Sequence, residues 1–317
     1  MSSASSQSDS APERLIDDSG ASAAGPAVGD KGVGAEGVKR FYADIHRKKD
    51  DSGYRITYTT DGENFRHVDS PSEIPVGPGD KVFVDTIPII HTDGFMELLR
   101  RGAEVYYLRR LSMIEAVRQR LNIKSKSAKS DIRVLMAIGD KWFRRVDEDF
   151  LIMRRMIAAF RSLLKTHQRL LNMSKAVSEM ERRILREEIR FNEERMRKLA
   201  EIIAEEAERR YPYYKTIADI LGIRDNHVMA REALAELLTY VDFSRGFMKL
   251  KRYLRLFDNK RYKQYNHETR HALTRLARAI HGTEQQGKQQ QELLKTIWTT
   301  IRQETQKLAG IPAQQQG

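Results

Sequence analysis

Two long segments without glycine or proline, residues 150–173 and 176–210, constrain the fold more than any other feature of the sequence. In the second segment, apolar residues recur at spacings of about three and four with charged residues between them, as in an amphipathic helix. The apolar positions are Ile184, Ile189, Met196, Leu199 and Ile203. The pattern predicts a helical coiled coil or antiparallel helical pair over residues 146–210. We expect a homodimer through it, since an apolar stripe that is not folded back on its own chain needs a partner.

The preceding section, residues 39–145, alternates between strand and helix patterns. A helix is predicted over 94–102, where Gly102 ends it, and turn residues Asp61-Gly62 and Gly79-Asp80 punctuate the strands. The predicted strands cover residues 40–48, 54–60, 81–87 and 103–109. This order predicts a mixed sheet with helices packed on it.

The flanking sections differ in composition. Residues 1–38 are rich in Ser, Ala, Gly and Asp, and we expect a disordered acidic tail. Residues 211–281 begin near Pro212 and have a helical pattern. Residues 282–317 predict a Gln-rich linker followed by one amphipathic helix.

The chain is basic, with 56 Lys and Arg against 44 Asp and Glu and a net charge of +12. Such a surplus favours a polyanionic partner, although a basic surface kept for solubility is the alternative. Cysteine is absent, which excludes disulfides and thiolate metal sites. With no apolar run near the ~20 residues that span a bilayer and no secretory signal pattern, we expect a cytoplasmic protein with no membrane partner, or a nucleoid-associated one.

Three aspartates stand where they could share a metal site. Asp44 lies on the first predicted strand, Asp85 ends the strand "KVFVD", and Asp131 begins a helix after "KSAKS". In an RNase H-like fold, carboxylates from adjacent strands and a later helix hold two Mg²⁺ ions for phosphodiester chemistry. Asp131 has an alternative explanation, because an acid in a first turn stabilises the helix dipole.

Residues 40–281 resemble the insertion-sequence transposases that have an N-terminal DEDD RuvC-like domain, a coiled coil and a C-terminal serine-containing transposase domain. Members of that family are recombinases that use a structured guide (bridge) RNA. The resemblance is carried by the order of several motifs. They are "YADIHRKK", "FVDT" followed by "GFMELLRRGAEVYYL", "KSAKSDIRVLMAI", the Arg-rich helices over 150–210, "TIADILGIRDNHVMAREALAEL", "RYLRLF" and "YNHETRHALTRLA".

The resemblance implies an α/β plus all-α protein. Its parts would be an RNase H-like (RuvC-like) mixed-sheet domain, a long helical coiled coil, and a small helical domain with a helix-hairpin-helix. It also implies that Asp44, Asp85 and Asp131 are the catalytic and metal-binding carboxylates. The family's third acid falls on Ala128, which cannot bind metal, and the segment "FDNKRYKQ" has no serine where the family's nucleophile is expected. Ser244 lies upstream, at a position that the family uses structurally.

Several basic segments are candidate nucleic-acid contacts. Cations interleaved with aromatics suit phosphate contact and base stacking, although a solvated basic helix face has a similar pattern. A hairpin loop "LGIRDN" would offer backbone N–H groups to a phosphate, or would simply connect two helices. The candidates are Arg109, Arg110, Arg118, Arg120, Lys124, Lys126, Lys129, Gly222, Arg224, Lys249, Lys251, Arg252, Tyr253, Arg255, Lys260, Arg261, Tyr262 and Lys263.

The sequence therefore predicts a nucleic-acid-binding protein derived from a DEDD-type transposase. It would hold structured RNA or DNA without efficient recombination and with weak Mg²⁺ binding. The alternative is an active, metal-dependent transposase, recombinase or nuclease. A purely structural scaffold is the third possibility, and it predicts no salt-dependent binding of nucleic acid.

Overall fold

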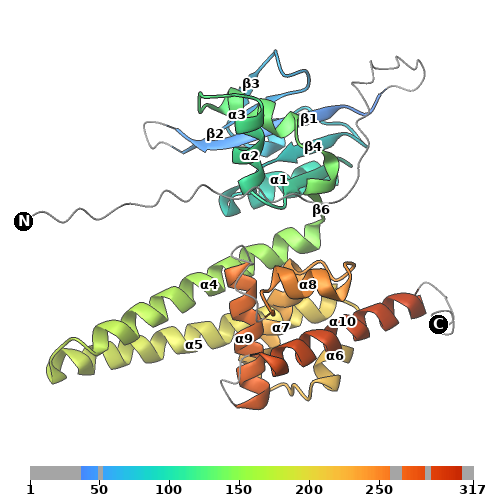
Figure 1. Ribbon diagram of the computed structural model, residues 1–317. Coiled ribbons are helices and arrows are strands. Elements are labelled where there is room, and N and C mark those ends of the chain that lie inside the picture. The colour runs from blue at the N-terminus through green and yellow to red at the C-terminus, as the bar shows by residue number, and fades with distance from the viewer. Residues whose placement is uncertain (1–36, 49–52, 258–265, 283–286, 309–317) are drawn as a thin grey trace, which may run out of the picture. The chain divides into compact units, whose positions relative to one another are not determined.

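A computed structural model describes residues 37–48, 53–257, 266–282 and 287–308 (Figure 1). The described chain contains a six-stranded mixed sheet in its first half and helices in the remainder, so the predicted combination of a mixed sheet with a helical remainder is confirmed. The predicted acidic tail lies outside the described residues, apart from its last two positions. No helix of the described part is long and apolar enough to cross a membrane.

The sheet has the strand order β3-β2-β1-β4-β5-β6. Strands β1, β2 and β3 pair antiparallel, β1, β4 and β5 pair parallel, and β6 is antiparallel to β5. Strand β6 is a strand that the sequence did not predict. The strands are β1 (Arg40–Arg47), β2 (Tyr54–Thr59), β3 (Arg66–Val68), β4 (Lys81–Val84), β5 (Glu104–Leu108) and β6 (Phe143–Val146).

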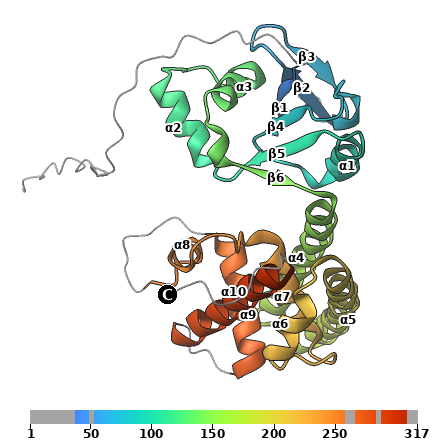
Figure 2. The same ribbon diagram turned by 90° about the vertical axis from the view of Figure 1, so that its right-hand side faces the viewer.

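Helices cover both faces of the sheet, with α2 and α3 on one side and α1 on the other (Figure 2). Side chains alternate between the two faces of each strand, so the same strand contributes to the hydrophobic cores on both sides of the sheet. Val82 and Val84 of β4 pack in the core with α1, whereas Phe83 between them packs in the core with α2 and α3. These helices are α1 (Thr92–Arg100), α2 (Ser112–Arg120) and α3 (Ala128–Met136).

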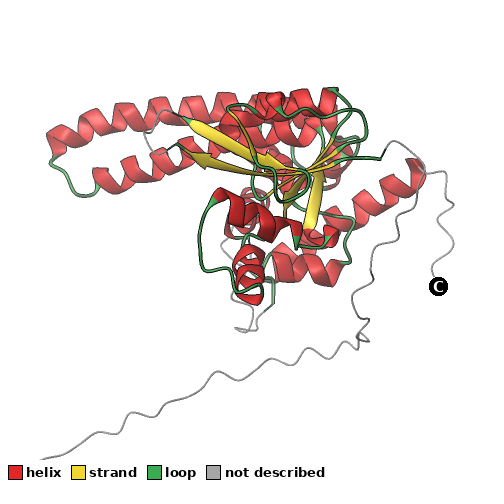
Figure 3. Cartoon of the chain, turned by 90° about the horizontal axis from the view of Figure 1, so that it is seen from above, coloured by secondary structure: helices red, strands yellow, loops and turns green. Residues whose placement is uncertain are grey.

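The glycine-free segments form two long helices, α4 (Glu148–Ser174) and α5 (Glu179–Arg210), which lie side by side as an antiparallel hairpin (Figure 3). Asn192 Nδ2 of α5 donates to Leu163 O of α4 at 3.1 Å, halfway along the pair. The apolar stripe of α5 that contains Met196 and Ile203 is thus covered by the same chain, and this stripe no longer argues for a homodimer.

The remaining helices share the core of the α4–α5 hairpin. They are α6 (Tyr214–Ile220), α7 (Val228–Tyr240), α8 (Phe247–Tyr253), α9 (His267–His281) and α10 (Lys288–Leu308). Helix α10 begins inside the Gln-rich stretch and buries Leu293, Leu294, Ile297 and Ile301. Three short 3-10 helices, Pro71–Glu73, Ile89–His91 and Asp140–Trp142, connect elements around the sheet.

Candidate acidic site

Strand alternation directs Asp44 and Asp85 to the same face of the sheet. The β1–β4 register pairs Ala43 with Val84, so the two aspartates are the next residues along two neighbouring parallel strands. Ala43 and Val84 pack on the α1 side. Because side chains alternate across a strand, Asp44 and Asp85 face the α2 and α3 side. Asp44 is only 8% exposed.

Asp131 reaches the same site from the first turn of α3. Ser127 caps this helix, and its hydroxyl accepts from the N–H of Ser130. Ile132 and Leu135 of α3 pack in one core with Phe83 and Tyr42 of the sheet. The cap and the apolar face together fix where Asp131 lies. Its position in the first turn also satisfies the helix-dipole explanation.

The three carboxylates interact electrostatically. Burial raises the pKa of Asp44 to about 6, and the charge of Asp131 adds to the rise. Burial raises the pKa of Asp85 to about 7, with the charges of Asp44 and Asp131 adding and the N–H of Thr86 opposing. Carboxylates raise one another's pKa values when they lie within interaction range, which agrees with the strand register and with the position of Asp131 in α3. The structure thus brings together Asp44, Asp85 and Asp131, which are 87 residues apart at the extremes of the sequence.

Arg118 and His46 are two partners whose roles at this site sequence reasoning missed. Arg118, one of the predicted phosphate contacts, instead forms an ion pair with Asp131 and a second one, at 3.2 Å, with Glu115. His46 Nδ1 lies 3.0 Å from Asp44 Oδ2. His46 follows Asp44 by two residues on one strand, so alternation places both on one face and was the available signal. No local pattern pairs Arg118 with Asp131.

The carboxylates of this site match the ligands of a divalent metal ion only in part. Asp44 and Asp85 are hard oxygen ligands of the kind that Mg²⁺ prefers, and a cation would relieve their mutual repulsion. However, Asp131 is already paired with Arg118, and Ala128 at the start of α3 has no side-chain atom that could bind a metal. Within the described residues, no group of three or more His, Asp or Glu is arranged to hold a metal ion. The carboxylate pair therefore suits one weakly held ion better than two.

The predicted basic residues near this site divide into engaged and unengaged side chains. Arg109 donates to Phe143 O and pairs with Asp242 at 3.1 Å. Arg120 donates a long 3.4 Å bond to Ala137 O, and Lys129 lies over the ring of Phe65. The side chains of three exposed cations make no hydrogen bond, ion pair or ring contact within the described residues, and these are Arg110, Lys124 and Lys126.

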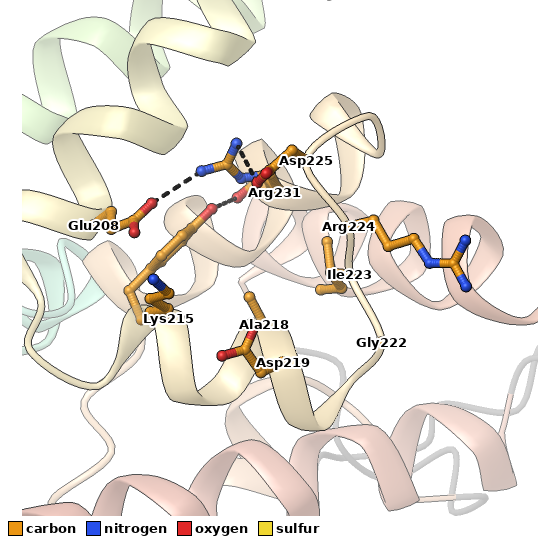
Figure 4. A pocket seen from close by; sticks show the side chains of 10 residues that line it. Glu208, Lys215, Ala218, Asp219, Gly222, Ile223, Arg224, Asp225 and Arg231 are labelled. Atoms are coloured by element: carbon orange, nitrogen blue, oxygen red, sulfur yellow. Dashed lines mark hydrogen bonds and ion pairs between the residues drawn. The ribbon is translucent and has the colours of Figure 1, made fainter.

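The α6–α7 loop lines an open pocket of about 610 Å³ (Figure 4). Gly222 adopts φ +66° and ends α6, where its N–H donates to Asp219 O and the next N–H donates to Ala218 O. Those two amides cap a helix and do not face a phosphate. Arg231 spans Glu208 and Asp225, while the exposed Arg224 points away from the other side chains. Arg224 is the residue of this loop best placed to contact an anion.

The remaining predicted contacts lie on or after α8. Lys249 is exposed, and Lys251 lies 4.6 Å from the centroid of the Phe257 ring. Arg252 and Arg255 are exposed, each with an interaction in the chain. Tyr253 packs against the helical core and its hydroxyl accepts from Asn266, so it is not an open stacking platform. Residues Lys260, Arg261, Tyr262 and Lys263 lie outside the described residues.

Comparisons with known proteins give no identification. No protein-family profile matches the chain, and no curated protein matches it. The resemblance to the DEDD transposases stays a prediction that rests on the motifs of the sequence.

Proposed function

We propose that this protein binds structured RNA or DNA through an RNase H-like domain descended from a DEDD-type transposase, without efficient recombination. The fold assignment is supported by the parallel run β1-β4-β5 beside the antiparallel run β1-β2-β3. The helix-hairpin-helix assignment is supported by α6 and α7, which the capped turn at Gly222 joins.

One observation carries the proposal: Asp44 from β1, Asp85 at the end of β4 and Asp131 from α3 converge on one face of the sheet. These are the elements from which an RNase H-like site draws its carboxylates. A fold gains nothing in stability by burying carboxylates that repel one another. Such a group is accordingly a functional-site candidate.

Binding is favoured over recombination by two features of this site. Ala128 removes one of the four expected acids, and the Arg118 guanidinium neutralises Asp131. Loss of a ligand and occupation of another weaken both metal affinity and the positioning of a reactive water. Exposed Arg110, just before α2, and Lys124 and Lys126, between α2 and α3, remain to contact phosphates.

Fluorescence anisotropy with a labelled RNA hairpin and a labelled DNA duplex, measured at several salt concentrations, tests the proposal. The K124A/K126A variant should bind about tenfold more weakly, and its plot of log K against log[salt] should be shallower by about 2. The K288A/K295A variant removes the same charge from α10 and should bind like the wild type. Absence of binding at low salt, or equal losses in both variants, would exclude the proposal.

A metal-dependent nuclease or recombinase is the second candidate, favoured by the raised pKa values of Asp44 and Asp85. These two residues would hold the ion, which would polarise a phosphodiester when bound. Cleavage of either nucleic acid that requires Mg²⁺ or Mn²⁺ and disappears in Asp44→Asn would establish this candidate. Cleavage that survives in Asp44→Asn would contradict this candidate.

A further inference from the structure

Arg154 of α4 carries a positive charge that the described part of the chain does not balance. Its guanidinium makes no hydrogen bond or ion pair within the described residues, and its Nη1 is shielded from solvent. By contrast, Arg155 pairs with Asp93 and Arg161 pairs with Glu236. An arginine stays protonated in proteins, and burying a donor or a charge without a partner costs free energy. Such an unsatisfied group calls for a physical explanation.

Arg154 lies among aromatic rings that come from three elements. The Tyr107 ring of β5 stacks on the Phe150 ring of α4 at 5.6 Å, and the Tyr240 ring of α7 lies 6.1 Å from the Phe150 ring. Arg161 Cζ lies 4.5 Å from the centroid of the Tyr240 ring. Phe150, Arg154 and Arg161 follow one another at spacings of four and seven residues, within about 40° around α4. Tyr240 therefore contacts residues on both sides of Arg154 along the helix.

The phenol groups of Tyr107 and Tyr240 are further donors at this place. Neither hydroxyl makes a hydrogen bond within residues 37–48, 53–257, 266–282 and 287–308. Burial lowers the pKa of Arg154, the phenols of Tyr240 and Tyr107 oppose the fall, and the charge of Arg161 adds to it. Both phenol groups therefore lie within interaction range of the guanidinium. All three side chains are partly buried, so each keeps some contact with solvent.

Arg144 of β6 is a second arginine beside these rings that lacks a carboxylate partner. It donates to the carbonyl oxygens of Thr239 and Tyr240 at 3.1 and 3.2 Å, and its Cζ lies 4.7 Å from the centroid of the Phe150 ring. It makes no ion pair in the part of the chain that the structure describes. Carbonyl groups carry only partial charges, so the positive charge of Arg144 is offset only in part. We name the arginine–tyrosine cluster by its four members, Tyr107, Arg144, Arg154 and Tyr240.

The chemistry of the cluster selects an anion that accepts several hydrogen bonds at once. The guanidinium offers two parallel N–H donors in a planar fork, which matches two oxygens of a phosphate, and a phosphate has further oxygens for the phenol hydroxyls. Glu236 and Glu268, whose charges act on Tyr240, are already paired with Arg161. Their repulsion of an incoming anion is therefore reduced.

We propose that the arginine–tyrosine cluster binds a phosphate group, with Arg154 as the principal contact and the hydroxyls of Tyr107 and Tyr240 as further donors. The phosphate belongs either to a small phosphorylated molecule or to a nucleic-acid backbone, because both present the same oxygens. The cluster is built from β5, β6, α4 and α7 and contains no residue of the acidic site. The proposal does not rest on the proposed function.

Thermal unfolding of the full chain, in inorganic phosphate and in sodium chloride of equal ionic strength, tests the proposal. At saturating phosphate the melting temperature of the wild type should rise by about 2–4 °C relative to chloride, since a ligand of the folded state stabilises it. Arg154→Met keeps the aliphatic stem but removes the charge, and this rise should disappear. Arg155→Met, at the exposed neighbouring position, is the matched control and should respond like the wild type.

The Y107F and Y240F variants test the cluster without changing a charge. Each removes one hydroxyl and keeps the ring that packs on Phe150, so each should weaken phosphate binding by about threefold to tenfold. A wild type that phosphate does not stabilise, an Arg154→Met variant that keeps the full rise, or an equal loss in Arg155→Met would overturn the proposal. Unchanged phosphate affinity in both tyrosine variants would overturn it too.

Anisotropy with a labelled RNA hairpin and a labelled DNA duplex distinguishes the two sources of the phosphate. If the cluster holds a backbone phosphate, Arg154→Met should weaken nucleic-acid binding and make the plot of log K against log[salt] shallower by about 1. If it holds a small phosphorylated molecule, nucleic-acid binding should be the same in Arg154→Met and the wild type, while the thermal response to phosphate is lost. Loss of the phosphate response in Arg154→Met supports the cluster even if the K124A/K126A variant excludes the proposed function.

Discussion

Buried carboxylates occur in both halves of the molecule, but the two halves differ in how many arginines balance their charge. In the helical half, Glu232 and Glu236 of α7 are almost fully buried and share two arginines. Arg161 of α4 and Arg275 of α9 lie 2.7 and 2.6 Å from Glu236 oxygens, and Arg275 also pairs with Glu232. Burial raises the pKa of Glu232, and Arg275 opposes that rise.

In the sheet half, three carboxylates have one arginine, Arg118, which is also shared with Glu115. The ion network of α4, α7 and α9 joins helices, so its charges serve the fold. Of the carboxylates beside α3, only Asp131 pairs with an arginine, and burial raises the pKa values of Asp44 and Asp85. This difference in compensation separates carboxylates that hold the structure from carboxylates available for a ligand.

The largest expected effect is in the helical half. Arg275→Leu leaves Glu232 and Glu236 with one arginine, and the free energy of unfolding should fall by about 3–5 kcal/mol because a buried charge becomes unpaired. Urea denaturation measures it. Lys307→Ala, which breaks the exposed pair with Glu304, is the control and should change stability by less than about 0.5 kcal/mol. An equally small effect of Arg275→Leu would remove the contrast between the two halves.

Arg118→Gln should lower the free energy of unfolding by about 2 kcal/mol, less than Arg275→Leu, because Arg118 and Asp131 both retain some contact with solvent. Arg120→Gln on the same helix is the matched control, since Arg120 makes one long bond and is exposed. If both variants have the same free energy of unfolding, Arg118 does not offset the negative charge of the acidic site.

Asp85→Asn should have the opposite sign and raise the free energy of unfolding by about 1–2 kcal/mol at pH 8 in EDTA. The substitution removes a charge that Asp44 and Asp131 repel. Glu236→Gln, at the same pH, should lower stability because it removes charge from the balanced network. The two halves would be equivalent if both substitutions changed stability in the same direction.

The pH dependence of stability tests the same contrast without disturbing a basic partner. The folded pKa values of Asp44 and Asp85 are raised to about 6 and about 7, above the unfolded value of about 3.9. The native state therefore binds more protons than the unfolded state, and this contribution to stability falls as pH rises from about 4 to 7. The difference in unfolding free energy between wild type and Asp44→Asn in EDTA should change over that interval. A flat difference would show that Asp44 has an ordinary pKa.

Much of the local structure was predictable because local rules decide it. The absence of glycine and proline predicted α4 and α5, and turn residues separated the predicted strands. Asp44 and Asp85 were recognisable as candidates because they occupy a strand and a strand end in neighbouring elements. Strand β6 was missed because its four residues, Phe143–Val146, acquire strand structure through pairing with β5.

The sequence by itself determined the long helices, the basic surplus and the spacing of the three aspartates, because each depends on residue type and local periodicity. Only the tertiary structure decided that Arg118 pairs with Asp131, that Gly222 caps α6, and that α4 covers one side of α5. These depend on contacts between residues distant in sequence, and such contacts form only when whole elements pack. A local sequence pattern does not tell which of several similar side chains will become a contact partner. The packing of whole elements decides it.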